Sequence, residues 1–181
     1  MEKIKIALIG YGNRGRLYSS FIKDNLDKID YVAIVDYRAN EIANDIKNNT
    51  SVKYIFTSDD DFFKAKLDID LVLICSMDKY HFTQAKRCLE SNYNILIEKP
   101  VSSNIDEVNE LNELASQKNL KVVVTYVLRY TLFYRKIKEI IISKKIGDIV
   151  NINTTENVAY WHQAHSYTRG NWKASKETGP M

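Results

Sequence analysis

Two charged residues, Glu98 and Lys99, directly follow an apolar run and precede Pro100, one of only two prolines in the chain. An ionised pair at the end of a buried strand is costly unless it meets a partner or solvent. Proline does not continue a central strand; it biases Lys99 towards an extended backbone, and the Lys-Pro bond can be cis. A lysine held in this way can take a proton from a hydroxyl group or stabilise an alkoxide. The pair therefore indicates either a reactive site or an exposed loop.

A second group of residues suited to chemistry is the glycine pattern in LIGYGNRG. Gly10, Gly12 and Gly15 have the spacing G-x-G-x-x-G, and they are three of the six glycines in the chain. After a strand, the first glycine permits a tight turn, the second lets backbone approach a pyrophosphate, and the third lets helix and strand pack closely. The following helix would offer its first N–H groups to the phosphates. We predict a dinucleotide site that includes Asn13 and Arg14; an ordinary glycine-rich turn is the alternative.

The dinucleotide pattern also expects a carboxylate about 20 residues further on, to bind the adenosine ribose hydroxyls. Asp36 lies 21 residues after Gly15, at the end of the next apolar run. A carboxylate repels a 2′-phosphate, so Asp36 favours NAD over NADP. Arg38 can bind a 2′-phosphate, stack on adenine or simply face solvent at a helix start, so NADP stays possible. We count Tyr37, between them, among the cofactor contacts.

The scaffold for these residues follows from an alternation of β-rich and helical segments. Strands are predicted at residues 3–10, 31–36, 52–56, 68–76, 93–99 and 120–127. Helices are predicted at residues 13–26, 39–49, 81–91 and 104–119. Apolar centres are typical of strands buried on both faces of a parallel sheet, and the alternation indicates right-handed βαβ units. Residues 1–125 therefore predict a doubly wound α/β domain, the Rossmann fold. In the predicted helix at residues 13–26, the helical spacing places the apolar residues Leu17, Phe21 and Ile22 on one side.

The carboxyl ends of the strands are where a doubly wound sheet binds its ligands. At the end of the fourth strand this rule selects Cys75, Ser76 and Met77. At the end of the fifth strand it selects Glu98 and Lys99. His81 begins the next helix, either as a residue that lines the cofactor or as a helix residue without a ligand.

Residues 126–181 have a different pattern and predict the start of a second, α+β domain. An amphipathic helix is predicted at residues 130–147, ended by Gly147. Residues 148–160 alternate apolar and polar side chains, which predicts a strand with one solvated face. Uncovered strand faces invite self-association, so we expect a homo-oligomer or partial disorder after about Asn157.

Composition narrows the class of protein. The 181-residue chain is 45% hydrophobic and 27% charged, with a net charge of +3, as in ordinary globular proteins. Acidic and basic residues are interspersed, and no apolar run reaches the ~18 residues of a membrane span, so we expect neither nucleic-acid nor membrane binding. Cys75 and Cys88 lie in apolar patterns that predict reduced core thiols. We expect a cytoplasmic protein without a metal site.

In order and spacing, these motifs resemble the Gfo/Idh/MocA oxidoreductases, relatives of glucose-fructose oxidoreductase and inositol dehydrogenase. The matching segments are GYGNRG with Asp36, SMDKYH at 76–81, EKP at 98–100, YVLRY at 126–130 and HSYTRGNW at 165–172. SMDKYH departs from the family, which often begins this segment with Thr-Pro. The resemblance implies a Rossmann domain followed by a substrate domain, and hydride transfer between NAD(P) and a small-molecule hydroxyl substrate such as a sugar or cyclitol.

The resemblance also implies roles for single residues. Lys99 becomes the catalytic residue beside the nicotinamide and the reacting hydroxyl, and Glu98 lies near the nicotinamide ribose. Arg129 and Trp172 approach the nicotinamide end. The family's proton-handling histidine follows a segment similar to KETGPM at 176–181, so we expect a fragment that binds cofactor but turns over weakly or not at all. A non-catalytic dinucleotide-binding or regulatory module is the alternative.

Overall fold

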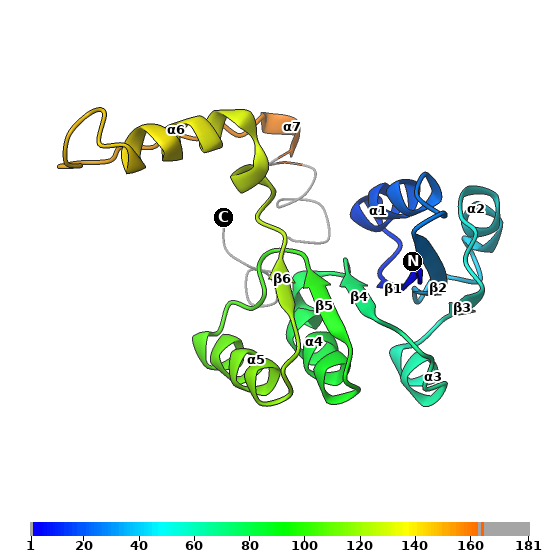
Figure 1. The fold of residues 1–181 in the computed structure, drawn as a ribbon. Helices are drawn as coiled ribbons and strands as arrows, with labels where there is room; N and C mark the ends of the chain where they lie inside the picture. Colours follow the sequence, from blue (N-terminus) through cyan, green and yellow to red (C-terminus); the bar gives the residue numbers. More distant parts are fainter. Residues whose placement is uncertain (1, 163, 165–181) are drawn as a thin grey trace. The chain divides into compact units, whose positions relative to one another are not determined.

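The computed structural model describes residues 2–162 and 164, and it divides the chain into two compact units (Figure 1). The first unit extends to Val124, and the second begins at Thr125. The segment HSYTRGNW with Trp172, and most of the region after Asn157 for which disorder was predicted, lie outside the described residues.

The first unit contains a six-stranded parallel sheet with the strand order β3-β2-β1-β4-β5-β6. The strands are β1 (Ile4–Ile9), β2 (Ile29–Val35), β3 (Tyr54–Phe56), β4 (Leu71–Ile74), β5 (Asn94–Ile97) and β6 (Val122–Val124). Chain progress reverses between β1 and β4, which is the topological switch point where such sheets bind ligands. The predicted doubly wound α/β fold is confirmed.

Helices cover both faces of the sheet in this unit (Figure 1). They are α1 (Asn13–Lys23), α2 (Ala43–Asn49), α3 (Asp59–Lys64), α4 (His81–Glu90) and α5 (Ile105–Gln117). Strand β1 shows the division, because side chains alternate between the faces of a strand. Leu8 belongs to the core cluster with α1 and α2, whereas Ala7 belongs to the cluster with α3, α4 and α5.

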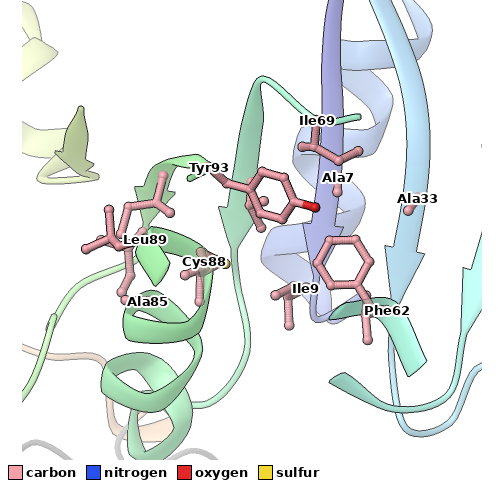
Figure 2. Close-up of a cluster of buried hydrophobic side chains, with 14 of the residues drawn as sticks. Ala7, Ile9, Ala33, Phe62, Ile69, Ala85, Cys88, Leu89 and Tyr93 are labelled. Atoms are coloured by element: carbon pink, nitrogen blue, oxygen red, sulfur yellow. The ribbon is translucent and has the colours of Figure 1, made fainter. Parts of the chain in front are cut away.

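The core beneath α3 and α4 is centred on two aromatic side chains (Figure 2). The ring centroids of Phe62 and Tyr93 lie 6.3 Å apart. The Tyr93 hydroxyl donates a hydrogen bond of 2.8 Å to the Leu67 carbonyl, so the polar end of this buried ring is satisfied. Burial raises the pKa of Tyr93. Cys88 packs in the same cluster as a free, buried thiol, as predicted.

Helix α3 was not predicted, although the sequence carries a signal for it. Ser58 is its N-cap, and the Ser58 hydroxyl accepts a hydrogen bond of 3.2 Å from the N–H of Asp61. The first turn, residues 59–61, contains three aspartates, and their negative charges stabilise the positive N-terminal end of the helix dipole.

Helix α2 begins later than predicted. The helix was expected from residue 39, but the chain forms a turn first and becomes helical only at Ala43.

Helix α1 buries only one of the three apolar residues that were predicted to share a side. Leu17 and Phe21 are 59% and 60% exposed, whereas Ile22 is buried. The buried face carries Gly15 and Ser19 together with Ile22. Only a small residue fits at Gly15, because a Cβ there would lie 3.2 Å from the Leu8 side chain of β1. The Ser19 hydroxyl lies 2.7 Å from the buried Tyr31 hydroxyl, which gives both groups a partner.

The second unit contains η2 (Val127–Tyr130), α6 (Leu132–Ile142) and the short α7 (Tyr160–His162). The prediction that Gly147 ends the amphipathic helix is wrong. α6 stops at Ile142, and Lys144 adopts a φ of 52°, with its N–H donating to the Ile141 carbonyl. The N–H of Lys145 donates to the Ile140 carbonyl, which completes a Schellman motif.

The prediction of a strand at residues 148–160 is also wrong. This segment has no strand in the structure, and Val150 and Ile152 are exposed. Alternation makes a segment suitable for a sheet, but a strand forms only with a hydrogen-bonded neighbour. The described residues of the second unit contain no such neighbour.

Candidate cofactor site

The glycine loop between β1 and α1 contains three glycines, two of which are tightly packed and one of which is open to solvent or a ligand. A Cβ on Gly10, whose φ is +92°, would lie 2.6 Å from the backbone nitrogen of Ser76. A Cβ on Gly15 would lie 2.1 Å from the Gly10 carbonyl oxygen. A Cβ on Gly12 would meet nothing within 4 Å. Gly10 and Gly15 are therefore needed for packing, and Gly12 leaves an open backbone surface that a ligand can approach.

The N-terminus of α1 has no group of its own to compensate its dipole. Gly12 is the N-cap, no side chain caps the helix, and its first turn contains no acidic residue. In contrast, α3 and α5 are capped by Ser58 and Asn104, and both have acidic first turns. The free N–H groups of α1 attract an anion, and the open position at Gly12 allows one to approach. These residues fit the pyrophosphate of a dinucleotide.

The loop after β2, residues 36–38, holds a buried carboxylate. Asp36 Oδ2 accepts a hydrogen bond of 2.9 Å from the N–H of Tyr11, and Oδ1 accepts one of 2.9 Å from the N–H of Arg38. The Arg38 guanidinium adds Nε to Oδ1 at 3.2 Å and Nη2 to Oδ2 at 3.3 Å. These bonds raise the pKa of Arg38. Tyr37 is exposed, with the Arg38 guanidinium carbon 5.3 Å from its ring centroid.

The loop after β5, residues 98–100, holds the second buried carboxylate. The Tyr18 hydroxyl donates a hydrogen bond of 3.0 Å to Glu98 Oε1, and Arg14 Nε lies 3.3 Å from the same oxygen. Both partners belong to α1, so Glu98 links the glycine-loop helix to the end of β5. The Lys99–Pro100 peptide bond is cis. Lys99 is exposed, and its amino group forms no ion pair with any residue described in the structure.

The loop after β4 forms the wall between these two carboxylates. Cys75 is buried, and burial, followed by the charge of Glu98, raises the pKa of its thiol. A thiol of this kind is protonated and is no nucleophile. The Ser76 hydroxyl donates to Gln84 Oε1 at 2.6 Å, and Gln84 Nε2 donates to Asp59 at 2.9 Å. Met77 is half-buried beside them.

His81 joins two of the loops through its ring. The side chain is 1% exposed, with Nδ1 2.6 Å from the Pro100 carbonyl oxygen and Nε2 3.1 Å from the Ser76 carbonyl oxygen. Each ring nitrogen thus faces a backbone carbonyl oxygen, which can accept a hydrogen bond from a ring N–H. His81 therefore connects the end of β4 with the loop after β5, instead of presenting its ring to solvent.

The structure brings most predicted site residues to one edge of the sheet, at the carboxyl ends of β1, β2, β4 and β5 (Figure 1). Asn13 and Arg14 lie exposed at the start of α1. Arg129 lies in the second unit, where its guanidinium carbon is 4.6 Å from the ring centroid of Tyr126. Trp172 lies outside the described residues.

Two contributors to this edge were missed from the sequence. The Tyr11 N–H is a donor to Asp36, and its position inside the glycine pattern was a usable signal. Tyr18 follows Arg14 by four residues, which places both on one helix face, but nothing in the sequence indicates that Glu98 is their partner.

Among the described residues, no cluster of His, Cys, Asp or Glu suits a metal ion, and no helix is long and apolar enough to cross a bilayer.

The fold and the glycine loop together define a dinucleotide-binding Rossmann protein. Residues 4–126 match the profile of the GFO_IDH_MocA family, described as an oxidoreductase family with an NAD-binding Rossmann fold. This match spans more than half of the chain. The chain belongs to the Gfo/Idh/MocA oxidoreductases, as the sequence motifs predicted.

Individual relatives agree with this assignment. The chain is 36% identical over 99 residues to the uncharacterized oxidoreductase YhhX of Escherichia coli, covering 55% of the chain and 29% of YhhX. It is 23% identical over 159 residues to scyllo-inositol 2-dehydrogenase (NADP(+)) IolW of Bacillus subtilis, covering 87% of the chain and 42% of IolW.

A solved structure with ligands also matches the fold. It is scyllo-inositol dehydrogenase from Lactobacillus casei with bound NAD(H) and scyllo-inositol, at a TM-score of 0.73 and 27% identity. The match covers 82% of this chain and 43% of that enzyme. The chain thus spans less than half the length of these three relatives.

Proposed function

We propose that this chain supplies the cofactor-binding part of an NAD(P)-dependent oxidoreductase that acts on a CH–OH group of a sugar, cyclitol or related small molecule. The observation that carries this proposal is the uncapped start of α1 behind an open Gly12, with a buried carboxylate on either side. Family membership supports the reaction class. The NAD(H) and scyllo-inositol bound to the Lactobacillus casei enzyme support the substrate class.

The residues of the chain divide the proposed task between them. A bound nicotinamide cofactor supplies the hydride acceptor for alcohol oxidation. The first N–H groups of α1 hold the pyrophosphate, and Asp36 serves the adenosine ribose. Lys99 is exposed beside the buried Glu98, so its amino group is available to a substrate hydroxyl, either to take its proton or to stabilise the alkoxide.

Cofactor binding is tested with Gly12→Ala, because this change separates binding from folding. The backbone of Gly12 has φ −80°, which alanine adopts, and the added methyl meets no protein atom within 4 Å. We expect an unchanged circular dichroism spectrum and thermal midpoint, with NADH affinity reduced at least tenfold by calorimetry. Wild-type chain that binds neither NAD(H) nor NADP(H) at millimolar concentration would refute the proposed function.

The role of Lys99 is tested with Lys99→Ala, using scyllo-inositol as the first substrate. We expect weak turnover or none by the 181-residue chain itself, and loss of any turnover in the variant with cofactor affinity little changed. Strong turnover that survives Lys99→Ala contradicts the assignment of Lys99. Cofactor binding without turnover in the wild type is compatible with the oxidoreductase part and with the alternative of a dinucleotide-binding module, so only turnover that Lys99→Ala abolishes separates the two.

Self-association is the remaining part of the proposal. The second unit exposes several large apolar side chains, among them Leu132, Phe133, Ile142, Ile146, Val150 and Ile152. Exposed apolar groups of this extent favour association, so we propose a homo-oligomer. Light scattering tests it: a monodisperse monomer at all concentrations contradicts the proposal.

A further inference from the structure

A chain of hydrogen bonds connects the start of α3 with the loop after β4. The Ser76 hydroxyl donates to Gln84 Oε1 at 2.6 Å, and Gln84 Nε2 donates to Asp59 Oδ2 at 2.9 Å. Gln84, in the middle, is 6% exposed, so its amide is shielded from water. Ser76 and Asp59 are half-buried. At the cofactor edge the chain therefore ends in the hydroxyl group of a partly exposed residue.

The direction of these hydrogen bonds is set by Asp59. An ionised carboxylate only accepts hydrogen bonds, so the amide nitrogen of Gln84 must face Asp59. The amide oxygen then faces Ser76, and an amide oxygen also only accepts. Ser76 has a single hydroxyl hydrogen, which it donates to Gln84. The Ser76 hydroxyl can therefore offer a ligand only its lone pairs, as an acceptor.

The main chain of Ser76 is held in place as well. Its carbonyl oxygen lies 3.1 Å from Nε2 of the buried His81. Its backbone nitrogen lies against the glycine loop, 2.6 Å from the position of a Cβ on Gly10. Contacts with α4 and with the glycine loop thus define the position of Ser76 before a ligand binds. A preorganised acceptor of this kind loses little conformational freedom on binding.

The strand order places Ser76 beside the nicotinamide half of a bound dinucleotide. Asp36, proposed for the adenosine ribose, follows β2, and the start of α1, proposed for the pyrophosphate, follows β1. On the other side of β1 lies β4, which Ser76 follows, and then β5, which Lys99 follows. A dinucleotide that crosses the switch point in this order brings its nicotinamide nucleoside to Ser76. That nucleoside carries hydrogen-bond donors, namely the ribose hydroxyls and the carboxamide N–H groups.

We propose that Ser76 binds the nicotinamide half of the dinucleotide as a hydrogen-bond acceptor, and that Gln84 and Asp59 are positioning residues that fix this polarity. The inference rests on the proposed function, because it needs a dinucleotide at the edge of the sheet. It goes beyond that function in giving a role to two residues that do not touch the cofactor. It also defines the ligand group that Ser76 selects, an O–H or N–H donor.

Calorimetry of NAD⁺ and 5′-ADP on the 181-residue chain tests the contact itself. 5′-ADP carries the adenosine and both phosphates without the nicotinamide half, so it reports whether the rest of the edge is intact. We expect Ser76→Ala to weaken NAD⁺ binding about fivefold, with 5′-ADP binding unchanged. Ser76→Thr keeps a hydroxyl with one hydrogen and should bind NAD⁺ like the wild type.

The role of Asp59 is tested with Asp59→Asn. Asparagine can donate as well as accept, so the Gln84 amide can turn over and donate to Ser76. With both orientations equally populated, half of the molecules present Ser76 with the wrong polarity, and NAD⁺ binds about twofold more weakly. Gln84→Met removes the acceptor of the Ser76 hydrogen and should weaken NAD⁺ binding at least as much. In both variants 5′-ADP should bind as in the wild type.

Asp60→Asn is the matched control for the loss of charge. Asp60 belongs to the same first turn of α3, but its side chain is 71% exposed and pairs with Arg87 at 2.8 Å. The substitution removes the same charge from the same helix start without touching Gln84, so NAD⁺ affinity should stay at the wild-type value. The thermal midpoint of each variant shows that it is folded.

The 3-acetylpyridine analogue of NAD⁺ identifies the donor, because it keeps the ribose hydroxyls and lacks the amide N–H groups. An analogue that binds more weakly to Ser76→Ala than to the wild type, as NAD⁺ does, assigns the contact to a ribose hydroxyl. An analogue that binds equally to both assigns it to the carboxamide. Either result supports Ser76 as an acceptor.

Three outcomes overturn this inference alone. Equal NAD⁺ affinity in the wild type and Ser76→Ala shows that the hydroxyl makes no contact. Equal NAD⁺ affinity in Asp59→Asn and Asp60→Asn shows that Asp59 does not set the polarity of Ser76. A parallel loss of NAD⁺ and 5′-ADP affinity in the variants of Ser76 and Gln84 shows a purely structural role. Wild-type chain that binds neither NAD⁺ nor NADP⁺ overturns the proposed function as well, which distinguishes that failure from the other three.

Discussion

Two carboxylates at the same edge of the sheet invite comparison, Asp36 after β2 and Glu98 after β5. Both are buried, and both pair with an arginine. Asp36 receives its guanidinium from Arg38, two residues further on in the same loop. Glu98 receives its partners, Arg14 and Tyr18, from α1 on another part of the sheet edge.

The two arrangements suit different tasks. The Asp36 pair is local, so its guanidinium can leave without disturbing another element, while two backbone N–H groups keep the carboxylate satisfied. The Glu98 cluster is long-range, and it joins the helix that begins the phosphate loop to the strand end that carries Lys99. Asp36 can therefore exchange its arginine for another donor, whereas Glu98 connects α1 to the end of β5.

The largest effect on stability is expected from Asp36→Ala. Removal of this carboxylate leaves the N–H groups of Tyr11 and Arg38 without their acceptor, and unsatisfied buried groups cost about 1–3 kcal/mol each. We expect the unfolding free energy in urea to fall by about 2–4 kcal/mol. Arg38→Ala, which keeps both backbone bonds, should cost well under half of this. Equal losses in the two variants would contradict the division between fixed and movable donors.

Glu98→Ala should have a smaller effect. Its partners Tyr18 and Arg14 are partly exposed, so water replaces some of the lost bonds. We expect a loss of about 1–2 kcal/mol in urea unfolding. Glu90→Ala, at an exposed site on α4, serves as the control and should change little. A loss at Glu98 larger than that at Asp36 would reverse the comparison.

A double-mutant cycle of Tyr18→Phe and Glu98→Ala isolates the contact between α1 and β5. The hydroxyl of Tyr18 donates to a carboxylate, so a coupling energy of about 1 kcal/mol is expected. The measurement is urea unfolding of the wild type, both single variants and the double variant. Additive losses would show that the two side chains do not support each other.

The smallest effect concerns alkaline pH and Cys75 beside Glu98. Burial and Glu98 raise the pKa of this thiol above its ordinary 9.0 in the folded chain. Above pH 9 the unfolded chain therefore binds fewer protons than the folded chain, and stability falls as pH rises. Well below pH 9 the thiol is protonated in both states, and its contribution to the unfolding free energy is fully present. At pH 9 half of the unfolded thiols are ionised, which lowers the unfolding free energy by about 0.4 kcal/mol. In a comparison of pH 7 and pH 9, Cys75→Ala should lose less stability than the wild type; an identical or steeper loss is the contrary result.

Some of this fold was open to prediction because its signals are local. The strand and helix alternation, the glycine spacing and the position of Asp36 all depend on residues close in the chain. The cap of α3 at Ser58 was such a signal too, and it was overlooked. The segment 148–160 shows the opposite case, since its alternation is real but a strand needs a neighbour that local pattern does not provide.

Residue patterns alone were enough to predict the Rossmann class, the glycine pattern behind a strand, and a carboxylate two residues from an arginine at the end of the second strand. The partners of Glu98, which are Arg14 and Tyr18, lie 84 and 80 residues away in the chain and became known from the folded structure. The folded structure also decided that Arg38 turns back onto Asp36. The physical reason is that a side chain's partner depends on which strand ends lie side by side, and the order β2-β1-β4-β5 follows from packing the whole sheet.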